Sequence, residues 1–361
     1  MSRAHNFNAG PAILPVQVVK ETAEAVIEFN NCGMGIMEIS HRSKDFEAVI
    51  KEAQSDLLKI MNLSPEEYYV LFLGGGASTQ FLMVPYNFLH SKADYIVTGV
   101  WAKKAYKEGK FFGSANVAAT SEDTNFNYLP TSFNFNPDAD FVHITTNNTI
   151  YGTEFKSLPD TGNIPLVADM SSDFLGMDFD YSKCSLIYAG AQKNIGPSGV
   201  TVVVVKKSWL EEKGKKDIPT MMNYKTHVDN DSMFNTPPCL PIFTVGRTFK
   251  WILEQGGVAA IKENNIKKAN VIYDVIDAYP DFYKGAVINK EDRSLMNITW
   301  NLPTPELETK FINEAKALNM IGLKGHRSVG GVRASVYNAS PIESSQALAK
   351  FMVEFYNNNN K

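Results

Sequence analysis

The sequence has little cysteine, no long apolar run and little excess of charge of either sign. Its cysteines are three, an odd number at wide spacings: Cys32, Cys184 and Cys239. They form neither a disulfide framework nor a metal-ligand pattern, so no metal is expected, and they fit a reducing cytoplasm. No apolar run is long enough to span a membrane, and residues 1–15 lack the charged start and apolar core of a signal peptide. A formal net charge of -4 gives no reason to expect nucleic acid or an anionic membrane as a partner.

The 361 residues contain instead a regular alternation of strands and helices. Hydrophobic residues make up 44% of the chain and charged residues 20%, which is typical of an ordinary globular protein with room for two domains. Two helices are predicted first, at about 15–29 and 46–61. Short apolar runs then predict strands separated by helical segments, at 68–73, 95–98, 141–145, 164–168, 185–189 and 200–205. This order predicts an α/β fold whose mostly parallel sheet has helices on both faces.

The pattern changes after Gly256 and Gly257. The elements predicted beyond this point are a helix at about 258–278, a strand at 295–300, a helix at about 305–318, an Arg-rich strand region at 325–337 and a final helix at 342–356. We therefore expect two domains. Residues 1–256 form an N-terminal segment and a large domain, and residues 257–361 form a smaller C-terminal α/β domain.

One lysine, Lys193, lies between two of the predicted buried strands. An ordinary explanation for such a residue is a solvated loop lysine. The flanking sequence argues against it, because apolar runs lie on both sides and the turn between them is rich in glycine: Gly190, Gly196 and Gly199. Burial favours the neutral amine and lowers the pKa of a lysine, which makes it a nucleophile for a carbonyl group. The sequence therefore predicts a Schiff-base lysine.

Residues able to bind a ligand follow several of the predicted strands. They are Ala77 and Ser78 after strand 68–73, Trp101 after 95–98, Thr149 after 141–145, Asp169 after 164–168 and Lys193 after 185–189. In an open parallel sheet, ligands bind outside the carboxyl ends of the strands. We therefore expect these side chains to meet at one edge of the sheet.

Each of these features has an ordinary explanation when taken alone. The run at 74–79 is neither a Walker loop nor a G-x-G-x-x-G motif, Asp169 is suited to a helix cap or a turn, and Trp101 to a core. Together, however, they match the needs of pyridoxal 5'-phosphate (PLP). This cofactor takes a lysine for covalent attachment, an acid beside its ring nitrogen, a phosphate cradle and a flat face to stack on.

Seven motifs resemble the phosphoserine aminotransferase family of class V, PLP-dependent aminotransferases. They are Asn8-Ala-Gly-Pro-Ala12, Ile39-Ser-His-Arg42, Gly74-Gly-Gly-Ala-Ser78, Ala168-Asp-Met-Ser-Ser172, Ala191-Gln-Lys-Asn-Ile-Gly-Pro-Ser-Gly199, Asn235-Thr-Pro-Pro238 and Gly325-His-Arg-Ser-Val-Gly-Gly-Val-Arg-Ala-Ser335. The resemblance covers essentially the whole chain. It implies a fold-type I enzyme with a large PLP-binding domain, a homodimer with shared active sites, and a role in L-serine biosynthesis. The implied reaction transfers an amino group from glutamate to 3-phosphohydroxypyruvate, giving phosphoserine and 2-oxoglutarate.

The resemblance also implies a role for individual residues. Lys193 and Asp169 are the catalytic pair, bonded to PLP and paired with its ring nitrogen. Further cofactor contacts fall on Gly76, Ala77, Ser78, Trp101, Thr149 and Gln192, and on Asn235 and Thr236 from the neighbouring subunit. The substrate contacts fall on His41, Arg42, His326, Arg327 and Arg333, some of them also from the neighbour. Arg333 is expected to hold the carboxylate that both substrates share, because the planar fork of an arginine suits a bidentate contact.

One departure and several alternatives remain at this stage. Some relatives carry an arginine directly after the Gly-rich run, where this chain has Ala77-Ser-Thr79. A cysteine desulfurase needs a catalytic cysteine that the C-terminal domain lacks, so a different class V aminotransferase is the nearer alternative. A catalytically silent nucleotide- or phosphate-binding protein is the alternative from another class. The resemblance leaves open whether the 4-phosphoerythronate-derived keto acid of pyridoxine biosynthesis is also a substrate.

Overall fold

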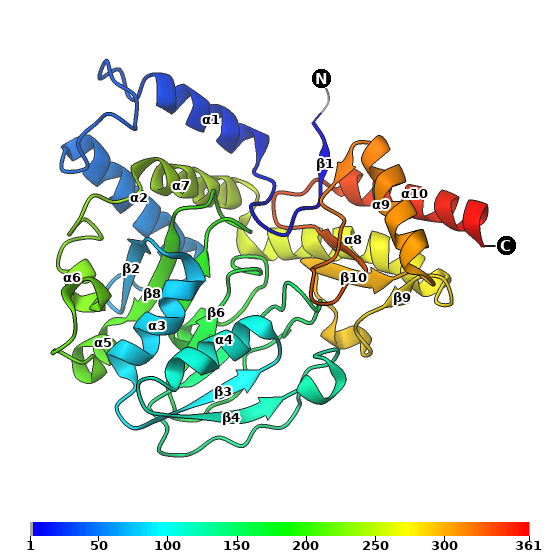
Figure 1. The fold of residues 1–361 in the computed structure, drawn as a ribbon. Helices are drawn as coiled ribbons and strands as arrows, with labels where there is room; N and C mark the ends of the chain where they lie inside the picture. Colours follow the sequence, from blue (N-terminus) through cyan, green and yellow to red (C-terminus); the bar gives the residue numbers. More distant parts are fainter. Residues whose placement is uncertain (1–2, 361) are drawn as a thin grey trace.

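A computed structural model describes residues 3–360 and shows a central sheet of seven strands (Figure 1). The strands are β2 (Tyr68–Leu73), β3 (Lys92–Val97), β4 (Ser114–Thr120), β5 (Val142–Thr145), β6 (Leu166–Asp169), β7 (Cys184–Gly190) and β8 (Thr201–Lys206). Their order across the sheet is β2-β8-β7-β6-β5-β3-β4. Only β8 runs against its neighbours, so the predicted α/β fold with a mostly parallel sheet is confirmed.

Successive side chains of the central strands enter two different apolar cores. In β8, Val202 and Val204 pack into one core, whereas Val203 and Val205 pack into the other. This alternation follows from the period of two in a β-strand. A run of β-branched residues is therefore buried on both faces, as expected of a strand covered by helices on either side.

Helices cover each face of the sheet. One core is completed by α1 (Val16–Ile27), α2 (Lys44–Met61) and α7 (Cys239–Glu254), and the other by α3 (Gly76–Phe88), α4 (Val100–Gly109), α5 (Lys207–Lys213) and α6 (Tyr224–Val228). Helix α2 begins where the Ser43 hydroxyl accepts a hydrogen bond from the Phe46 N–H, and it ends at Asn62 in a left-handed conformation. Short 3₁₀ turns also occur within residues 3–360: η1 (Glu122–Thr124), η2 (Tyr181–Lys183), η3 (Thr220–Met222) and η4 (Lys290–Asp292).

The C-terminal part of the chain builds a third core around a smaller sheet. Its elements are α8 (Gly257–Ala278), β9 (Lys284–Gly285), β10 (Asn297–Asn301), α9 (Pro305–Ala317), β11 (Met320–Ile321), β12 (Val332–Ser335) and α10 (Ile342–Asn359). The strand order of the small sheet is β12-β10-β9. The N-terminal strand β1 (His5–Asn6) pairs in parallel with β11, and Phe7 is buried in the third core. The start of the chain therefore belongs structurally with its end.

The division into residues 1–256 and 257–361 remains a proposal. Gly256 is the N-cap of α8, but β1 and Phe7 pack with the C-terminal elements. The extreme ends of the two proposed ranges, residues 1, 2 and 361, lie outside the described residues.

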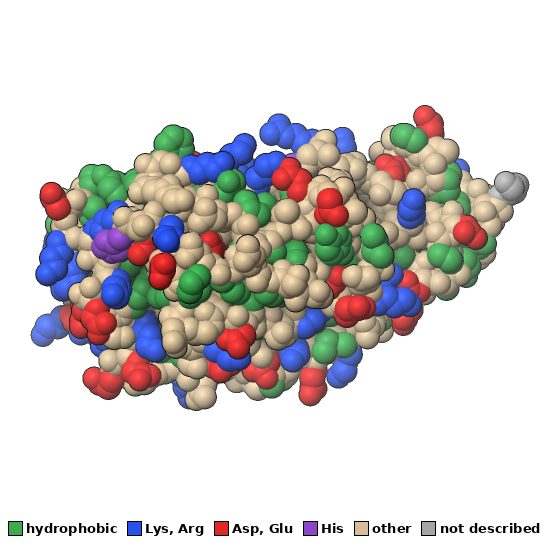
Figure 2. Space-filling view, turned by 90° about the horizontal axis from the view of Figure 1, so that it is seen from below, with side chains coloured by type: hydrophobic (Ala, Val, Ile, Leu, Met, Phe, Trp, Pro, Cys, Tyr) green, Lys and Arg blue, Asp and Glu red, His purple; other side chains and the backbone are tan. Residues whose placement is uncertain are grey.

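Between residues 3 and 360, none of the helices combines the length and apolar character that crossing a membrane requires. In that same part of the chain, no three His, Cys, Asp or Glu side chains are grouped so as to hold a metal ion. On the face shown in Figure 2, basic and acidic side chains are interspersed rather than separated by sign.

Candidate active site

A cavity of about 260 Å³ opens at the carboxyl ends of the parallel strands. Its walls are formed by Gly75, Gly76, Ala77, Ser78, Trp101, Thr145, Asn147, Thr149, Asp169, Ser171, Ser172, Gln192 and Lys193. The fold thus brings together every residue that the sequence placed at a strand end. The sheet explains this convergence, because β2, β5, β6 and β7 point the same way and end at one edge.

Lys193 occupies the turn that leads from β7 into β8. The turn is closed by backbone hydrogen bonds from Ala191 N to Val200 O and from Gly196 N to Ala191 O. The lysine Nζ donates a hydrogen bond of 2.7 Å to Thr149 Oγ1 and lies 5.7 Å from the centre of the Trp101 ring. Burial lowers the pKa of Lys193 to about 8, an effect that the negative charge of Asp169 opposes. The amine is therefore more readily neutral than that of a surface lysine.

Asp169 is the last residue of β6 and is only 3% exposed. Its Oδ1 accepts hydrogen bonds from the N–H of Ser171 at 3.0 Å and from the Ser171 hydroxyl at 2.6 Å. Burial raises the pKa of Asp169, whereas the two Ser171 contacts and the nearby Lys193 lower it. One oxygen of Asp169 therefore closes a turn, which is the ordinary role considered for this residue from the sequence. The other has no hydrogen-bond partner among the described residues, and the side chain lines the cavity.

The Gly-rich run forms the turn between β2 and α3. Gly75, the N-cap of α3, has a φ of 90°, and a Cβ atom there would lie 1.9 Å from Thr79 Oγ1. Glycine is therefore required at this position. The first helical hydrogen bond runs from Thr79 N to Gly75 O, and the first turn contains neither a capping side chain nor an acidic residue. The preceding N–H groups, which include those of Ala77 and Ser78, are thus available to an anion in the cavity.

Trp101 lies in the first turn of α4 and contributes an aromatic ring to the cavity wall. Its Nε1 is buried without a hydrogen-bond partner in the described chain. One helical turn further on, Lys104 places its Nζ 4.3 Å from the centre of the same ring. The spacing of three residues along a helix explains this contact, which the sequence analysis did not single out.

A second cavity, of about 220 Å³, contains Arg333 and His326, and its wall includes Ile150 and Tyr151, which directly follow Thr149 of the first. Arg333 extends from β12, and its Nη1 donates a hydrogen bond of 3.1 Å to the carbonyl oxygen of Thr149. Thr149 therefore contacts Lys193 through its hydroxyl and Arg333 through its backbone. Burial lowers the pKa of His326, and the positive charges of Arg333, Arg327 and Lys104 lower it further.

Five of the expected contacts line neither of these two cavities within one chain. Asn235 and Thr236 are exposed and line a neighbouring cavity of about 490 Å³, which includes Gly75. His41 and Arg42 lie in the turn before α2, outside both cavities that contain Lys193 and Arg333. Arg327 is exposed beside His326.

Some of the cavity wall was not foreseen from the sequence. Ser171 and Ser172 directly follow Asp169, and Thr145 and Asn147 shortly precede Thr149. Their closeness in sequence to predicted site residues was the one feature that could have indicated a place in the wall. Asp173, four residues after Asp169, is almost completely buried behind the cavity. A Ser-Ser-Asp sequence after a strand reads equally well as a solvated turn, so nothing in the sequence distinguished it.

The side chains around Lys193 fit PLP. The buried turn offers a lysine of lowered pKa, Asp169 has an oxygen without a partner, and the α3 N-terminus has free N–H groups. Trp101 adds the flat face. Enzymes that use this cofactor are the class to which the fold and the cavity point.

Comparison with known proteins agrees with that class. The family model described as Aminotransferase class-V matches residues 4–348. Phosphoserine aminotransferase of Lysinibacillus sphaericus is 53% identical over 98% of each chain. The solved structure of phosphoserine aminotransferase from Bacillus circulans subsp. alkalophilus is 48% identical, covers 99% of each chain and superposes with a TM-score of 0.96. That of PLP-bound phosphoserine aminotransferase from Trichomonas vaginalis is 37% identical, covers 97% of this chain and all of its own, and has a TM-score of 0.91.

The chain belongs to the class V aminotransferases and, within them, to the phosphoserine aminotransferase family. It is a PLP-dependent transaminase.

Proposed function

We propose that the protein transfers an amino group from glutamate to 3-phosphohydroxypyruvate, giving phosphoserine and 2-oxoglutarate for L-serine biosynthesis. The observation that carries this proposal is the joint position of Lys193 and Arg333 on either side of Thr149. A carboxylate held by the arginine brings the adjacent α-carbon toward the lysine, and both substrates have such a carboxylate. The similarity to phosphoserine aminotransferases supports this choice of substrates.

The cofactor supplies one chemical ability when bound, which is to absorb the electrons left behind when the Cα–H bond of the amino acid breaks. Asp169 would place a negative charge near the ring nitrogen and favour its protonated form. The free N–H groups at the start of α3, together with Ser78, would hold the phosphate, and Trp101 would offer a flat face to the ring.

Lys193 would hold the cofactor covalently and move the proton. With the cofactor bound, its neutral amine would accept the proton from the substrate Cα as a general base and give it up again as a general acid. Its lowered pKa suits this task, because a base must be unprotonated at working pH. Thr149 Oγ1 accepts a hydrogen bond from Nζ and so keeps the amine over the cavity.

Arg333 grips the carboxylate next to the reacting carbon in both substrates. The distal group differs, since it is a carboxylate in glutamate and a phosphate in the keto acid. We assign the distal contact to four basic residues: His41, Arg42, His326 and Arg327. The chain lacks the extra arginine of some relatives after the Gly-rich run, so these four have a larger share of the phosphate contact.

A homodimer completes the site in this proposal. His41, Arg42, Asn235 and Thr236 lie away from Lys193 within one chain, so a second copy of the chain has to present them. Their exposure in the single chain supports this arrangement for Arg42, Asn235 and Thr236.

The test combines spectroscopy with a substrate comparison. Purified wild-type protein should absorb near 400 nm, roughly where PLP bonded to a lysine absorbs, and glutamate should bleach that band. Lys193→Ala should lose both the band and repeated turnover, whereas Lys51→Ala, which removes a surface lysine of α2, should keep them. Near wild-type turnover by Lys193→Ala without added amine contradicts the assignment.

The choice of keto acid decides the remaining part of the proposal. Transfer from glutamate to 3-phosphohydroxypyruvate is expected, and the 4-phosphoerythronate-derived keto acid is assayed beside it. A protein without the 400 nm band would be a silent phosphate-binding protein. A protein with the band that rejects both phosphorylated keto acids would be a different class V aminotransferase.

A further inference from the structure

Three buried carboxyl groups lie close enough for their charges to affect one another, one in the cavity wall and two outside its lining. Asp169, in the wall, is 3% exposed, and Asp173 and Glu154 are 1% and 0% exposed. An ionised carboxylate is stable in such a place only where hydrogen-bond donors or cations replace its water. The hydrogen bonds of each group therefore indicate which of the three carry a charge.

Two of the carboxyls have such donors. Asp169 accepts two hydrogen bonds from Ser171. Glu154 forms an ion pair with Lys156, at 2.5 Å between Oε2 and Nζ, and accepts a hydrogen bond of 2.9 Å from the N–H of Leu295. Its Oε1 is buried without a hydrogen-bond partner in the described chain. Each group therefore has two donors on one oxygen, and in Glu154 one of them is a cation.

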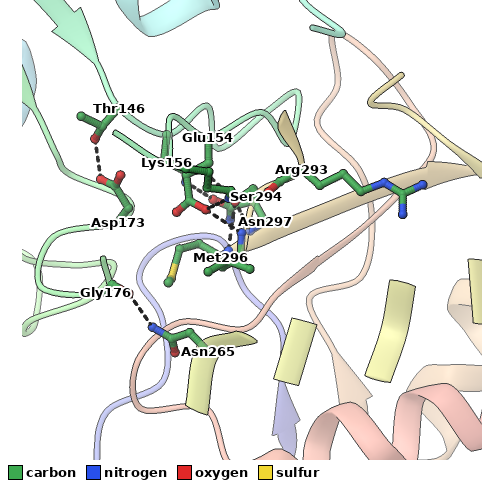
Figure 3. A network of polar contacts seen from close by, with 12 residues as sticks. Thr146, Glu154, Lys156, Asp173, Gly176, Asn265, Arg293, Ser294, Met296 and Asn297 are labelled. Atoms are coloured by element: carbon green, nitrogen blue, oxygen red, sulfur yellow. Dashed lines mark hydrogen bonds and ion pairs between the residues drawn. The ribbon is translucent and has the colours of Figure 1, made fainter. Parts of the chain in front are cut away.

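Asp173 has no comparable donor. Its Oδ1 lies 2.6 Å from the hydroxyl oxygen of Thr146, the contact drawn between these two residues in Figure 3. Its Oδ2 is buried and has no partner in the described part of the chain. Neither an N–H group nor a cation within that part contacts either oxygen. A charge at this position would be almost uncompensated.

The hydroxyl of Thr146 has only one hydrogen to donate. Its Oγ1 lies 2.6 Å from Asp173 Oδ1 and 3.2 Å from the backbone carbonyl oxygen of Asp169, which can only accept. If Asp173 is ionised, one hydrogen must serve two acceptors. If Asp173 carries a proton, it donates to Thr146, and Thr146 donates to the carbonyl, so both contacts are satisfied.

We propose that Asp173 is a protonated positioning residue, which donates to Thr146 and through it fixes the end of β6 that carries Asp169. Of these two aspartates, only Asp169, which lines the cavity, then carries a charge. The protonation is independent of the proposed function, whereas its use in orienting Asp169 toward the cofactor depends on it.

The surroundings of Asp173 agree with a retained proton. Burial raises its pKa well above the usual value, the charges of Glu154 and Asp169 raise it further, and only the Thr146 contact and the charge of Lys156 lower it. The other titratable groups that face it from neighbouring elements are Tyr181, Lys193 and Tyr337. The amine of Lys193 is the one additional cation among these groups, and Thr149 rather than Asp173 accepts its hydrogen bond.

The sign of the stability effect follows from this raised pKa. As pH rises above the ordinary aspartate range, the unfolded chain loses the proton while the folded chain keeps it. Folding stability therefore falls with rising pH until the pKa of Asp173 in the folded state is passed. Asp173→Asn cannot ionise, so it does not share this loss.

The first experiment measures thermal unfolding of the cofactor-free protein from pH 5 to pH 9. The melting temperature of Asp173→Asn relative to wild type should rise with pH. Glu154→Gln is the matched control, because it removes a carboxylate that is paired with Lys156, and it should melt below wild type at neutral pH. A difference between Asp173→Asn and wild type that is constant or falls with pH overturns the proposal.

Two further measurements test separately whether Asp173 is protonated and whether it positions Asp169. Infrared spectra of the wild type at pH 8 should contain the carbonyl stretch of a buried carboxylic acid, which Asp173→Asn should lack. Absence of this band in the wild type overturns the proposal even if no variant folds. In PLP titrations followed by fluorescence, Asp173→Asn keeps a donor for Thr146 and should retain affinity, whereas Asp173→Leu should lose about tenfold. Equal affinities of the two variants overturn the positioning role.

Discussion

The lowered pKa of Lys193 leads to a prediction about the cofactor-free protein. The pKa is about 8, compared with 10.5 for an ordinary lysine. At pH 8 about one half of the Lys193 side chains are then neutral, compared with about one in 300 for an ordinary lysine. Burial is the main cause, and the charge of Arg333 acts in the same direction. The charge of Asp169 acts against both, as that of Asp173 does when it is ionised.

Two substitutions should therefore move this pKa in opposite directions. Asp169→Asn removes a negative charge and should lower the pKa of Lys193 further. Arg333→Met removes a positive charge and should raise it. Neither substitution alters the lysine itself, so a difference in reactivity reports on the electrostatics of the cavity.

Selective acylation of the cofactor-free protein at a series of pH values provides the assay. The rate is read from the peptide that contains Lys193 by mass spectrometry, and the exposed Lys107 serves as the reference in the same digest. The midpoint for Lys193 should fall near pH 8 in the wild type. A midpoint close to 10.5, or shifts of the two variants in the reverse order, would show that burial and charge do not act on this lysine as argued.

Three further predictions concern the cofactor and the substrates. Asp169→Asn keeps the acceptor for Ser171 but removes the charge, so transamination should slow by roughly a hundredfold while the melting temperature changes little; unchanged activity with lower stability would favour a purely structural role. Arg327→Ala should raise KM roughly ten- to a hundredfold more for phosphorylated substrates than for glutamate, whereas Arg333→Ala should impair both half-reactions; equal losses in Arg327→Ala contradict this division. Gly75→Ala places a Cβ against Thr79 at a positive φ, so it should destabilise the protein by about 1–3 kcal/mol in calorimetry and weaken PLP binding in a titration. Gly74→Ala has open space around the added Cβ and should have neither effect.

The main sheet was largely predictable because most of its strands consist of apolar and β-branched residues. The range 68–73 coincides with β2, since an apolar run there is followed directly by glycines. Strand β4 was missed. Its sequence, Ser114-Ala-Asn-Val-Ala-Ala-Thr120, is small and polar, and it lies at the sheet edge, where pairing with β3 rather than its own composition stabilises it.

Helix α7 was also missed, for a different reason. The segment Cys239–Glu254 contains a proline, a glycine and several β-branched residues, which lower helix propensity. Its burial against α1, α2 and the sheet overrides that propensity. Stabilisation by such tertiary contacts cannot be predicted from the local sequence pattern.

The same distinction applies to the cavity. Residues at strand ends were predictable as a group, because parallel strands end at one edge of a sheet. The contact of Arg333 with Thr149 was not, since it joins β12 of the small sheet to a loop of the large one. The proton assigned to Asp173 depends on which donors surround it, and only the folded structure places those donors.

The pairing of β1 with β11 has a consequence for how the protein is made. His5 leaves the ribosome long before its partner Met320, which follows only after the chain between them has been synthesised. The N-terminal segment also contacts the lysine turn, where Ala12 N donates to Gln192 O, and Tyr337 donates from the C-terminal part to Ala9 O. The large sheet can form during translation, as early domains commonly do, but the segment that joins it to the small core has to wait until β11 has been synthesised. A nascent chain should therefore acquire most of its hydrogen-exchange protection before it can acquire a finished active site.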